Sequence, residues 1–238
     1  MKRTLTILLL LCMVCMSGRA QEKSGSNAFF SAEKSGGQVA FGLRGGINLS
    51  TLAYLLDDGT RTVDSRHIGF NAGIEMDVPI LKSLGFQSGL YFVQKGLKEN
   101  VDGFSYGERQ KTVGTPCYLE IPLLACYRHD FGTKLQLQVK TGPYVAYGVC
   151  GKLKVKEYDS HGIKTQEAEV DWFGNENDAN TAAFRRFDMG WHLGAGLKIK
   201  GGLYLGYAFE AGFLDISRTD VYKGVKTRSH WIDVGFNF

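Results

Sequence analysis

The residues most suggestive of chemistry lie in the segment 187–199, where Asp188, His192 and Lys198 are interspersed with glycines, and Glu210 follows in the next segment. A histidine near carboxylates has the composition of a general acid–base pair. The same residue types also suit a structural network in which buried charges neutralise one another. Which role applies depends on the environment of the face that carries these side chains.

Other catalytic and metal-binding signatures are absent from the sequence. There is no G-x-x-x-x-G-K-[ST] phosphate loop, no H-E-x-x-H zinc helix and no G-x-S-x-G nucleophile turn. The acidic run DWFGNENDAN at 171–180 lacks the ordered spacing of a calcium loop. This favours a solvated acidic loop and leaves a weak surface ion site as the alternative. The remaining histidines are too scattered to share a metal; they are His67, His129, His161 and His230. We therefore predict no metal and no cofactor.

The chain begins with a secretory leader. Lys2 and Arg3 precede an apolar run at 5–16, and small residues then lead to Ala20, after which we predict cleavage. Removing the leader takes three of the 28 basic residues and leaves 25 against 24 acidic ones. The basic isoelectric point of the precursor is therefore no sign of nucleic-acid binding. We predict a signal peptide at 1–20, a flexible Ser- and Gly-rich tail at 21–37 and one domain at 38–238.

Three cysteines remain after cleavage, namely Cys117, Cys126 and Cys150. Three is too small a number for a disulfide framework, and an odd number of cysteines cannot all be paired. Cys117 and Cys150 are the best-placed pair for a single bridge, because both fall near the same end of an expected hairpin. Free thiols are the alternative, and the sequence slightly favours them.

The mature chain is built from segments of about ten residues in which apolar side chains recur at every second position, the pattern of half-exposed strands. No apolar run after the leader reaches the 20 or so residues of a membrane-spanning helix. We predict eight strands at 39–49, 68–78, 86–97, 118–128, 135–149, 187–199, 203–213 and 230–238.

The connections between these segments alternate strictly in length. Long ones at 50–67, 98–117, 150–186 and 214–229 alternate with short turns at 79–85, 129–134 and 200–202. In an up-and-down antiparallel sheet, this alternation places every long loop at one end and the turns and termini at the other. Eight strands also close without leaving an exposed edge. The sequence therefore predicts an all-β fold, an eight-stranded antiparallel up-and-down transmembrane β-barrel.

The two faces of the strands decide which solvent surrounds the barrel. Bulky apolar residues fill one face of every strand, whereas glycines and charges share the other. A soluble calyx would have the reverse arrangement, so we expect lipid outside and a narrow lumen packed with paired charges. His192 then lies in the lumen, which favours the structural role over catalysis. The predicted lumen network is Arg44, Glu75, Asp77, Lys95, Glu120, Arg128, Lys140, Asp188, His192, Lys198, Glu210 and Asp233.

Several segments are similar to a known family. YLEIPLLACYR at 118–128, GPYVAYG at 142–148, FDMGWHLGAGLKI at 187–199 and WIDVGFNF at 231–238 resemble the small porin-like outer-membrane β-barrel domain family of Gram-negative bacteria, with OmpA/OmpX-like eight-stranded barrels. The resemblance implies an outer-membrane location with periplasmic termini, and contact with outer-membrane lipid. It also implies that the terminal Phe238 is the signal read by the barrel-assembly machinery.

These patterns favour a non-enzymatic outer-membrane barrel, whose long loops contact an unknown extracellular ligand or support envelope stability. Two alternatives stay open at this point. A lipid-modifying barrel enzyme would need a nucleophile and a base converging at one rim. A narrow channel would need a lumen that the predicted charges do not fill.

Overall fold

A computed structural model describes part of the chain. The predicted leader, its cleavage after Ala20 and the first residues of the tail lie outside the described residues, so these predictions are not tested. The described residues are 30–55, 61–63, 66–102, 109–173, 184–199, 201–218 and 223–238.

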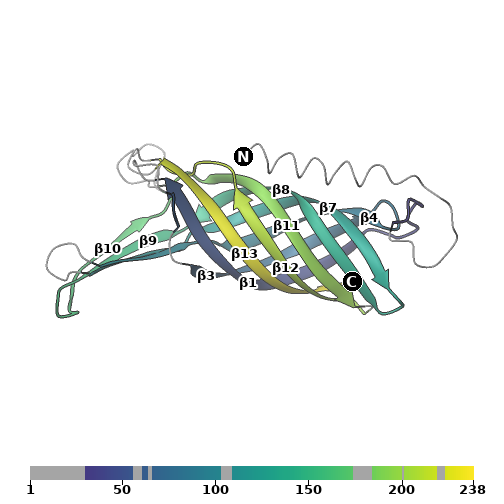
Figure 1. The fold of residues 1–238 in the computed structure, drawn as a ribbon, viewed down its shortest axis with the longest axis horizontal. Coiled ribbons are helices and arrows are strands. Elements are labelled where there is room, and N and C mark those ends of the chain that lie inside the picture. Colours follow the sequence, from purple (N-terminus) through teal and green to yellow (C-terminus); the bar gives the residue numbers. More distant parts are fainter. Residues whose placement is uncertain are drawn as a thin grey trace. The chain divides into compact units, whose positions relative to one another are not determined.

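Eight long antiparallel strands close into a barrel (Figure 1). Each strand pairs with the next along the chain within the barrel, and β13 pairs with β1 to complete the circle. This confirms the predicted eight-stranded antiparallel barrel. The barrel strands are β1 (Ala40–Leu55), β3 (His67–Pro79), β4 (Leu84–Gln94), β7 (Cys117–Phe131), β8 (Leu135–Cys150), β11 (Phe187–Ile199), β12 (Leu203–Gly212) and β13 (Lys223–Asn237).

The alternation of side chains along each strand determines which residues face outward. In β12, Leu203, Leu205 and Tyr207 are about half exposed, while Tyr204, Gly206 and Ala208 between them are buried. The apolar outer face and the polar, glycine-containing inner face are therefore those predicted. Within the described ranges, no helix is long and apolar enough to cross a bilayer.

Glycines on the inner face make room for large side chains. Gly196 of β11 and Gly206 of β12 lie opposite each other in the register. A Cβ atom on either glycine would collide with the ring of Tyr204. The lumen is thus too crowded at this level to accept an added methyl group.

A second sheet of four strands was not predicted. It contains β5 (Leu97–Asp102), β6 (Arg109–Gly114), β9 (Lys152–Tyr158) and β10 (Lys164–Asp171), in the order β10-β9-β6-β5. Strands β9 and β10 extend beyond the barrel at the end opposite the C-terminus (Figure 1). The expectation that 98–117 and 150–186 are simple loops is therefore wrong, and the acidic run's neighbours Glu167 and Glu169 belong to a strand. We call β5, β6, β9 and β10 the external sheet.

The largest differences from the predicted strand boundaries occur at three places. β1 continues to Leu55, where the short β2 (Arg61–Val63) pairs with it. β13 begins at Lys223 instead of at residue 230, and Leu97 starts β5 instead of ending a barrel strand. The polar start of β13 lacks an apolar face, and so periodicity did not reveal it. The end of β1 does carry apolar residues, and Leu52 and Ala53 there are buried.

The described part of the predicted tail lies against the turn between β3 and β4. The backbone N–H of Ser31 donates to Ser83 Oγ at 2.9 Å, and that of Lys82 donates to the carbonyl of Glu33 at 2.9 Å. Lys34 and Leu81 also form an isolated bridge. The flexibility predicted for 21–37 stays a prediction.

Candidate functional site in the barrel interior

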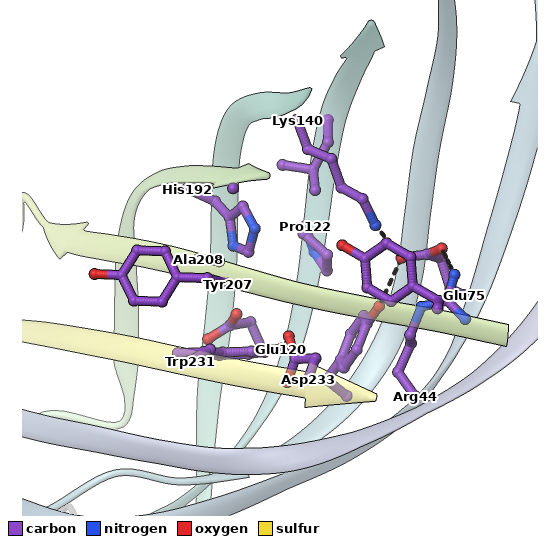
Figure 2. A pocket seen from close by; sticks show the side chains of 14 residues that line it. Arg44, Glu75, Glu120, Pro122, Lys140, His192, Tyr207, Ala208, Trp231 and Asp233 are labelled. Atoms are coloured by element: carbon purple, nitrogen blue, oxygen red, sulfur yellow. Dashed lines mark hydrogen bonds and ion pairs between the residues drawn. The ribbon is translucent and has the colours of Figure 1, made fainter. Parts of the chain in front are cut away.

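One ionic cluster joins β1, β3, β4 and β8 on the inner wall, and Figure 2 shows Arg44, Glu75 and Lys140 pointing toward one another. Arg44 Nη2 donates to Glu75 Oε1 at 2.5 Å, and Lys140 Nζ donates to Glu75 Oε2 at 2.9 Å. The hydroxyl of Tyr91 donates to the same Oε2 at 3.2 Å. Two cations and a hydroxyl thus surround one buried carboxylate. The guanidinium of Arg44 and the ammonium of Lys140 each lie 4.4 Å from the ring centroid of Tyr204, which adds cation–π attraction.

A second cluster lies nearer the external sheet. Lys95 Nζ is 2.7 Å from Glu120 Oε2 and 3.2 Å from Glu210 Oε2. Its ammonium also lies 4.4 Å from the ring centroid of Tyr144. Lys95, Glu120 and Glu210 are 3%, 0% and 1% exposed as side chains. A single cation therefore bridges two carboxylates that are wholly removed from solvent.

His192 completes this second cluster. The register pairs it directly with Glu210, and its Nδ1 lies 2.9 Å from Glu210 Oε1. The imidazole packs edge-on against Trp231 at 6.0 Å between ring centroids. His192 and Glu210 thus face each other across β11 and β12. The ring faces the lumen and not the lipid-facing rim that a lipid-modifying base would use.

The other predicted network residues have different surroundings. Arg128 of β7 forms an ion pair with Asp77 of β3. Asp188 accepts hydrogen bonds from Thr227 at 2.8 Å and from Tyr144 at 3.3 Å. These hydroxyl partners, like Tyr91, were not predicted from the sequence, because an uncharged hydroxyl adds nothing to the charge pattern of a strand. The only sequence signal for these hydroxyl residues is that they occupy inward-facing positions in the alternation of their strands.

Asp233 and Lys198 are the two predicted members with the least direct connection. Asp233 lines the cavity of Figure 2 together with Glu75 and His192. Lys198 is half-buried on β11, opposite Gln136 of β8 and Tyr204 of β12. Both lie on the predicted inner face.

An apolar cluster lies at the loop end of the lumen, where sequence reasoning expected only polar loops. Trp172 stacks on Phe184 at 4.1 Å between ring centroids, and Phe173 packs edge-on against Tyr118 at 5.4 Å. Trp172 is 0% and Phe173 is 4% exposed. We call this cluster the loop-end cap; its residues are Leu52, Leu97, Tyr118, Tyr144, Ala146, Trp172, Phe173, Ile216 and Val225, with Leu153 and Phe184 packed against them.

Glycines on the strands accept the two large rings of the cap. A Cβ atom on Gly114 would collide with Trp172, and one on Gly148 would collide with Phe173. Arg186 fixes the same region, donating to the carbonyl of Gly148 at 2.9 Å and to that of Phe173 at 3.1 Å. Two adjacent aromatic residues inside an acidic run were the available sequence signal for this cap.

The external sheet is cross-linked by exposed ion pairs. Glu169 of β10 pairs with Lys152 and, at 3.0 Å, with Lys154 of β9. Glu167 pairs with Lys164 at 2.6 Å and with Lys156 at 3.2 Å. Hydrogen bonds from these lysines lower the pKa of both glutamates below the ordinary value.

No metal centre is formed by the residues that the structure describes, because no three His, Cys, Asp or Glu side chains are grouped to hold an ion. Residues 174–180 of the acidic run lie outside the described part of the chain.

A closed antiparallel barrel with an apolar outer wall and an ionic interior defines the class of outer-membrane β-barrel proteins. Residues 20–218 match the family model described as outer membrane protein beta-barrel domain. The chain belongs to this family and is located in the outer membrane of a Gram-negative bacterium. The resemblance found in the sequence is thereby confirmed.

Solved structures with a similar fold are small outer-membrane proteins. Ail of Yersinia pestis shares 16% identity, with 85% of this chain and 100% of that one covered, at a TM-score of 0.42. OprG of Pseudomonas aeruginosa shares 14% identity, with 87% and 97% covered, at 0.39. Neisserial surface protein A shares 10% identity, with 85% and 100% covered, at 0.38. A search of curated proteins found no match.

Proposed function

We propose that the protein is a non-enzymatic outer-membrane barrel. Its lumen is filled by paired charges, and its external sheet contacts the surroundings of the cell or supports envelope stability. The observation that carries this proposal is the pairing of Lys95 with both Glu120 and Glu210 in the interior. Buried ions that join strands across the lumen act as cross-links of the wall, since each would be costly to leave unpaired.

Two layers of side chains support a lumen that does not conduct. The ionic clusters around Glu75 and Lys95 form one layer, and the loop-end cap with Trp172 and Phe173 forms the other. An eight-stranded barrel has an interior only wide enough for its own side chains. A solute would have to displace both layers to pass.

Planar-bilayer recording tests the closed lumen against the channel alternative. We expect no stepwise ion conductance from the purified protein at salt concentrations where an added porin, the positive control, conducts. A variant with Trp172→Gly and Phe173→Gly tests the cap separately. It should still not conduct, because the ionic layer is intact. Reproducible single-channel steps from the unmodified protein would support the channel instead.

The external sheet supports a role in contact outside the cell. All eight residues of β10 are exposed, and the sheet continues two barrel hairpins beyond the apolar band. We infer that the long connections face outward and that the short turns and both termini face the periplasm. The apolar wall would contact outer-membrane lipid, and Phe238, exposed beside Phe41, would be read by the assembly machinery.

Surface labelling of intact cells tests this sidedness. A membrane-impermeant amine reagent should label Lys154, Lys156 and Lys164 of the external sheet. Lys82 is the matched control, because it is 59% exposed but lies at the β3–β4 turn on the inferred periplasmic side. It should react only after the outer membrane is broken. Labelling of Lys82 in intact cells, with the lysines of the external sheet protected, would show that the inferred topology is the wrong way round.

The enzymatic alternative is tested by mass spectrometry of lipid A from cells with and without the protein. We expect identical acyl-chain and phosphate patterns, because His192 is enclosed by Glu210 and Trp231 inside the wall. A change in lipid A that depends on His192 would support the enzyme.

The domain boundaries are also proposals. N-terminal sequencing of the protein from outer membranes should begin at Gln21, directly after the inferred cleavage site.

A further inference from the structure

Two cysteines lie at the joint between the barrel and the external sheet. The chain passes from β6 into β7 through Thr115 and Pro116, and from β8 into β9 through Gly151. β6 pairs with β9, and β7 pairs with β8. These segments therefore form one long two-stranded ribbon with a break in the middle. Cys117 is the first residue of β7 and Cys150 is the last residue of β8, so the pair borders the break directly.

The register places the two cysteines opposite each other. Cys117 pairs with Cys150 across the antiparallel ladder. Directly opposed residues in such a ladder have Cα atoms about 4.5–5.5 Å apart, which is inside the range that a disulfide requires. Both thiols are free. Both also line the same surface pocket.

The third cysteine cannot compete for either partner. Cys126 is buried on β7, where it pairs with Lys140 of β8. Nine residues of a β-strand separate it from Cys117, a distance of about 30 Å. Cys126 therefore serves as an internal reference thiol.

The ladder at the joint is irregular. Pro116 has no backbone N–H to donate, and the register shifts between Cys117 and Tyr118, which leaves an extra residue on β8. The backbone N–H of Thr115 donates to the carbonyl of Lys152 at 3.0 Å, and the backbone N–H of Lys95 donates to the carbonyl of Pro116 at 3.0 Å. The backbone N–H of Trp172 also donates to the carbonyl of Gly151 at 3.0 Å, and the ring of Trp172 packs beside Gly114.

We propose that Cys117 and Cys150 are a redox modification site, oxidised to a disulfide after export. An outer-membrane protein crosses the periplasm, where thiols are oxidised, and the exposed Cys150 is accessible to an oxidant. The oxidant class is a protein that carries a reactive disulfide.

The reaction is a double thiol–disulfide exchange. The thiolate of Cys150 attacks one sulfur of the oxidant's disulfide, which breaks that bond and releases one oxidant thiolate. The thiolate of Cys117 then attacks Cys150 Sγ and displaces the second oxidant thiolate. Two protons pass from the cysteine thiols to the oxidant, so the pair loses two electrons and the oxidant becomes a dithiol.

Counting alkylated thiols tests this proposal. The mature protein is taken from outer membranes, denatured in iodoacetamide without reductant and analysed by intact mass and peptide mapping. We expect one alkylated thiol, Cys126, before reduction and three after it. Cys117→Ser and Cys150→Ser should each show two alkylated thiols without reductant, and Cys126→Ser should show none.

Three alkylated thiols in the unreduced protein would overturn the proposal. A disulfide-linked dimer, or a bridge that contains Cys126, would overturn it as well. Because the measurement is made on denatured protein, a variant that folds poorly still reports its thiol count. A second measurement follows cleavage by an added protease: reducing the unmodified protein should speed cleavage at the joint, whereas reducing Cys117→Ser should have no effect. Equal cleavage of reduced and unreduced unmodified protein would count against the cross-link.

Discussion

At the scale of single residues, the interior depends on shared charges. Glu75 is held by two cations, and Lys95 holds two carboxylates. Removing one partner of such a group leaves a buried charge without compensation. The resulting loss of stability is larger than the stability that the intact pair adds over an apolar replacement of both partners. The pairing of His192 with Glu210 was predictable, because strand alternation and one tight turn determine the register. The bonds of Asp188 with Tyr144 and Thr227 were not, because they depend on how far the side chains reach inside the lumen and, for Thr227, join β11 to β13, which are not adjacent in the barrel.

Lys95→Met should destabilise the protein by about 3–5 kcal/mol, because Glu120 and Glu210 lose their shared cation. Reversible unfolding in detergent measures the change. Adding Glu120→Gln and Glu210→Gln to Lys95→Met should restore most of the loss. The control Lys82→Met removes an exposed ion pair and should cost less than about 1 kcal/mol. Equal effects of the two single substitutions would contradict a buried role for Lys95.

At the scale of elements, the external sheet is anchored by the loop-end cap. The sheet was missed in the sequence because β10 is exposed on both faces, so no apolar alternation marks it. The barrel strands were found because lipid on one side and the lumen on the other impose a two-residue period. Trp172 and Phe173 were predicted to lie in a solvated loop, because the residues around these two aromatic side chains are polar.

Trp172→Ala should cost about 3–5 kcal/mol of local stability, since its ring is fully buried against Phe184 and Gly114. Limited proteolysis should then cut the external sheet faster and leave the barrel strands intact. Ile163→Ala is the matched control, because Ile163 is 64% exposed at the turn between β9 and β10. Its effect should stay within about 0.5 kcal/mol. Unchanged proteolysis of Trp172→Ala would rule out the anchoring role.

The ion pairs of the external sheet predict a pH response. The pKa of Glu167 is lowered, chiefly by its hydrogen bond with Lys164. A depressed pKa means that the pair stabilises the sheet above the ordinary glutamate range and loses this contribution as pH falls through the lowered pKa. Lys164→Gln should move the pKa of Glu167 back up, as followed by NMR titration. A pKa that does not change on substitution would show that the pair does not form in solution.

At the scale of the whole molecule, the fold follows from a contrast between two environments. Outward residues such as Leu193, Leu205 and Val234 are about half exposed on the free barrel wall, as expected for side chains that lipid covers. Inward positions alternate between glycines and large or charged side chains. The sequence could reveal this contrast, the strand number and the closure. It could not reveal the external sheet or the cap, because they form beyond the bilayer, where that contrast no longer applies.

Closure of the barrel predicts heat-modifiable migration on gels. The unheated protein in mild detergent should run faster than the boiled protein, because the closed ladder resists unfolding by detergent. A single position before and after boiling would argue against a closed barrel.

The most direct test of the central claim, that hydrocarbon covers the apolar wall and not the interior, is tryptophan quenching by lipids with brominated acyl chains. Trp191 faces outward and is 45% exposed, whereas Trp172 and Trp231 are buried. With Trp172→Phe and Trp231→Phe in place, we predict strong quenching of the remaining Trp191. With only Trp191→Phe in place, the fluorescence of the two buried tryptophans should not be quenched. Quenching of the interior tryptophans, with Trp191 unaffected, would contradict the account.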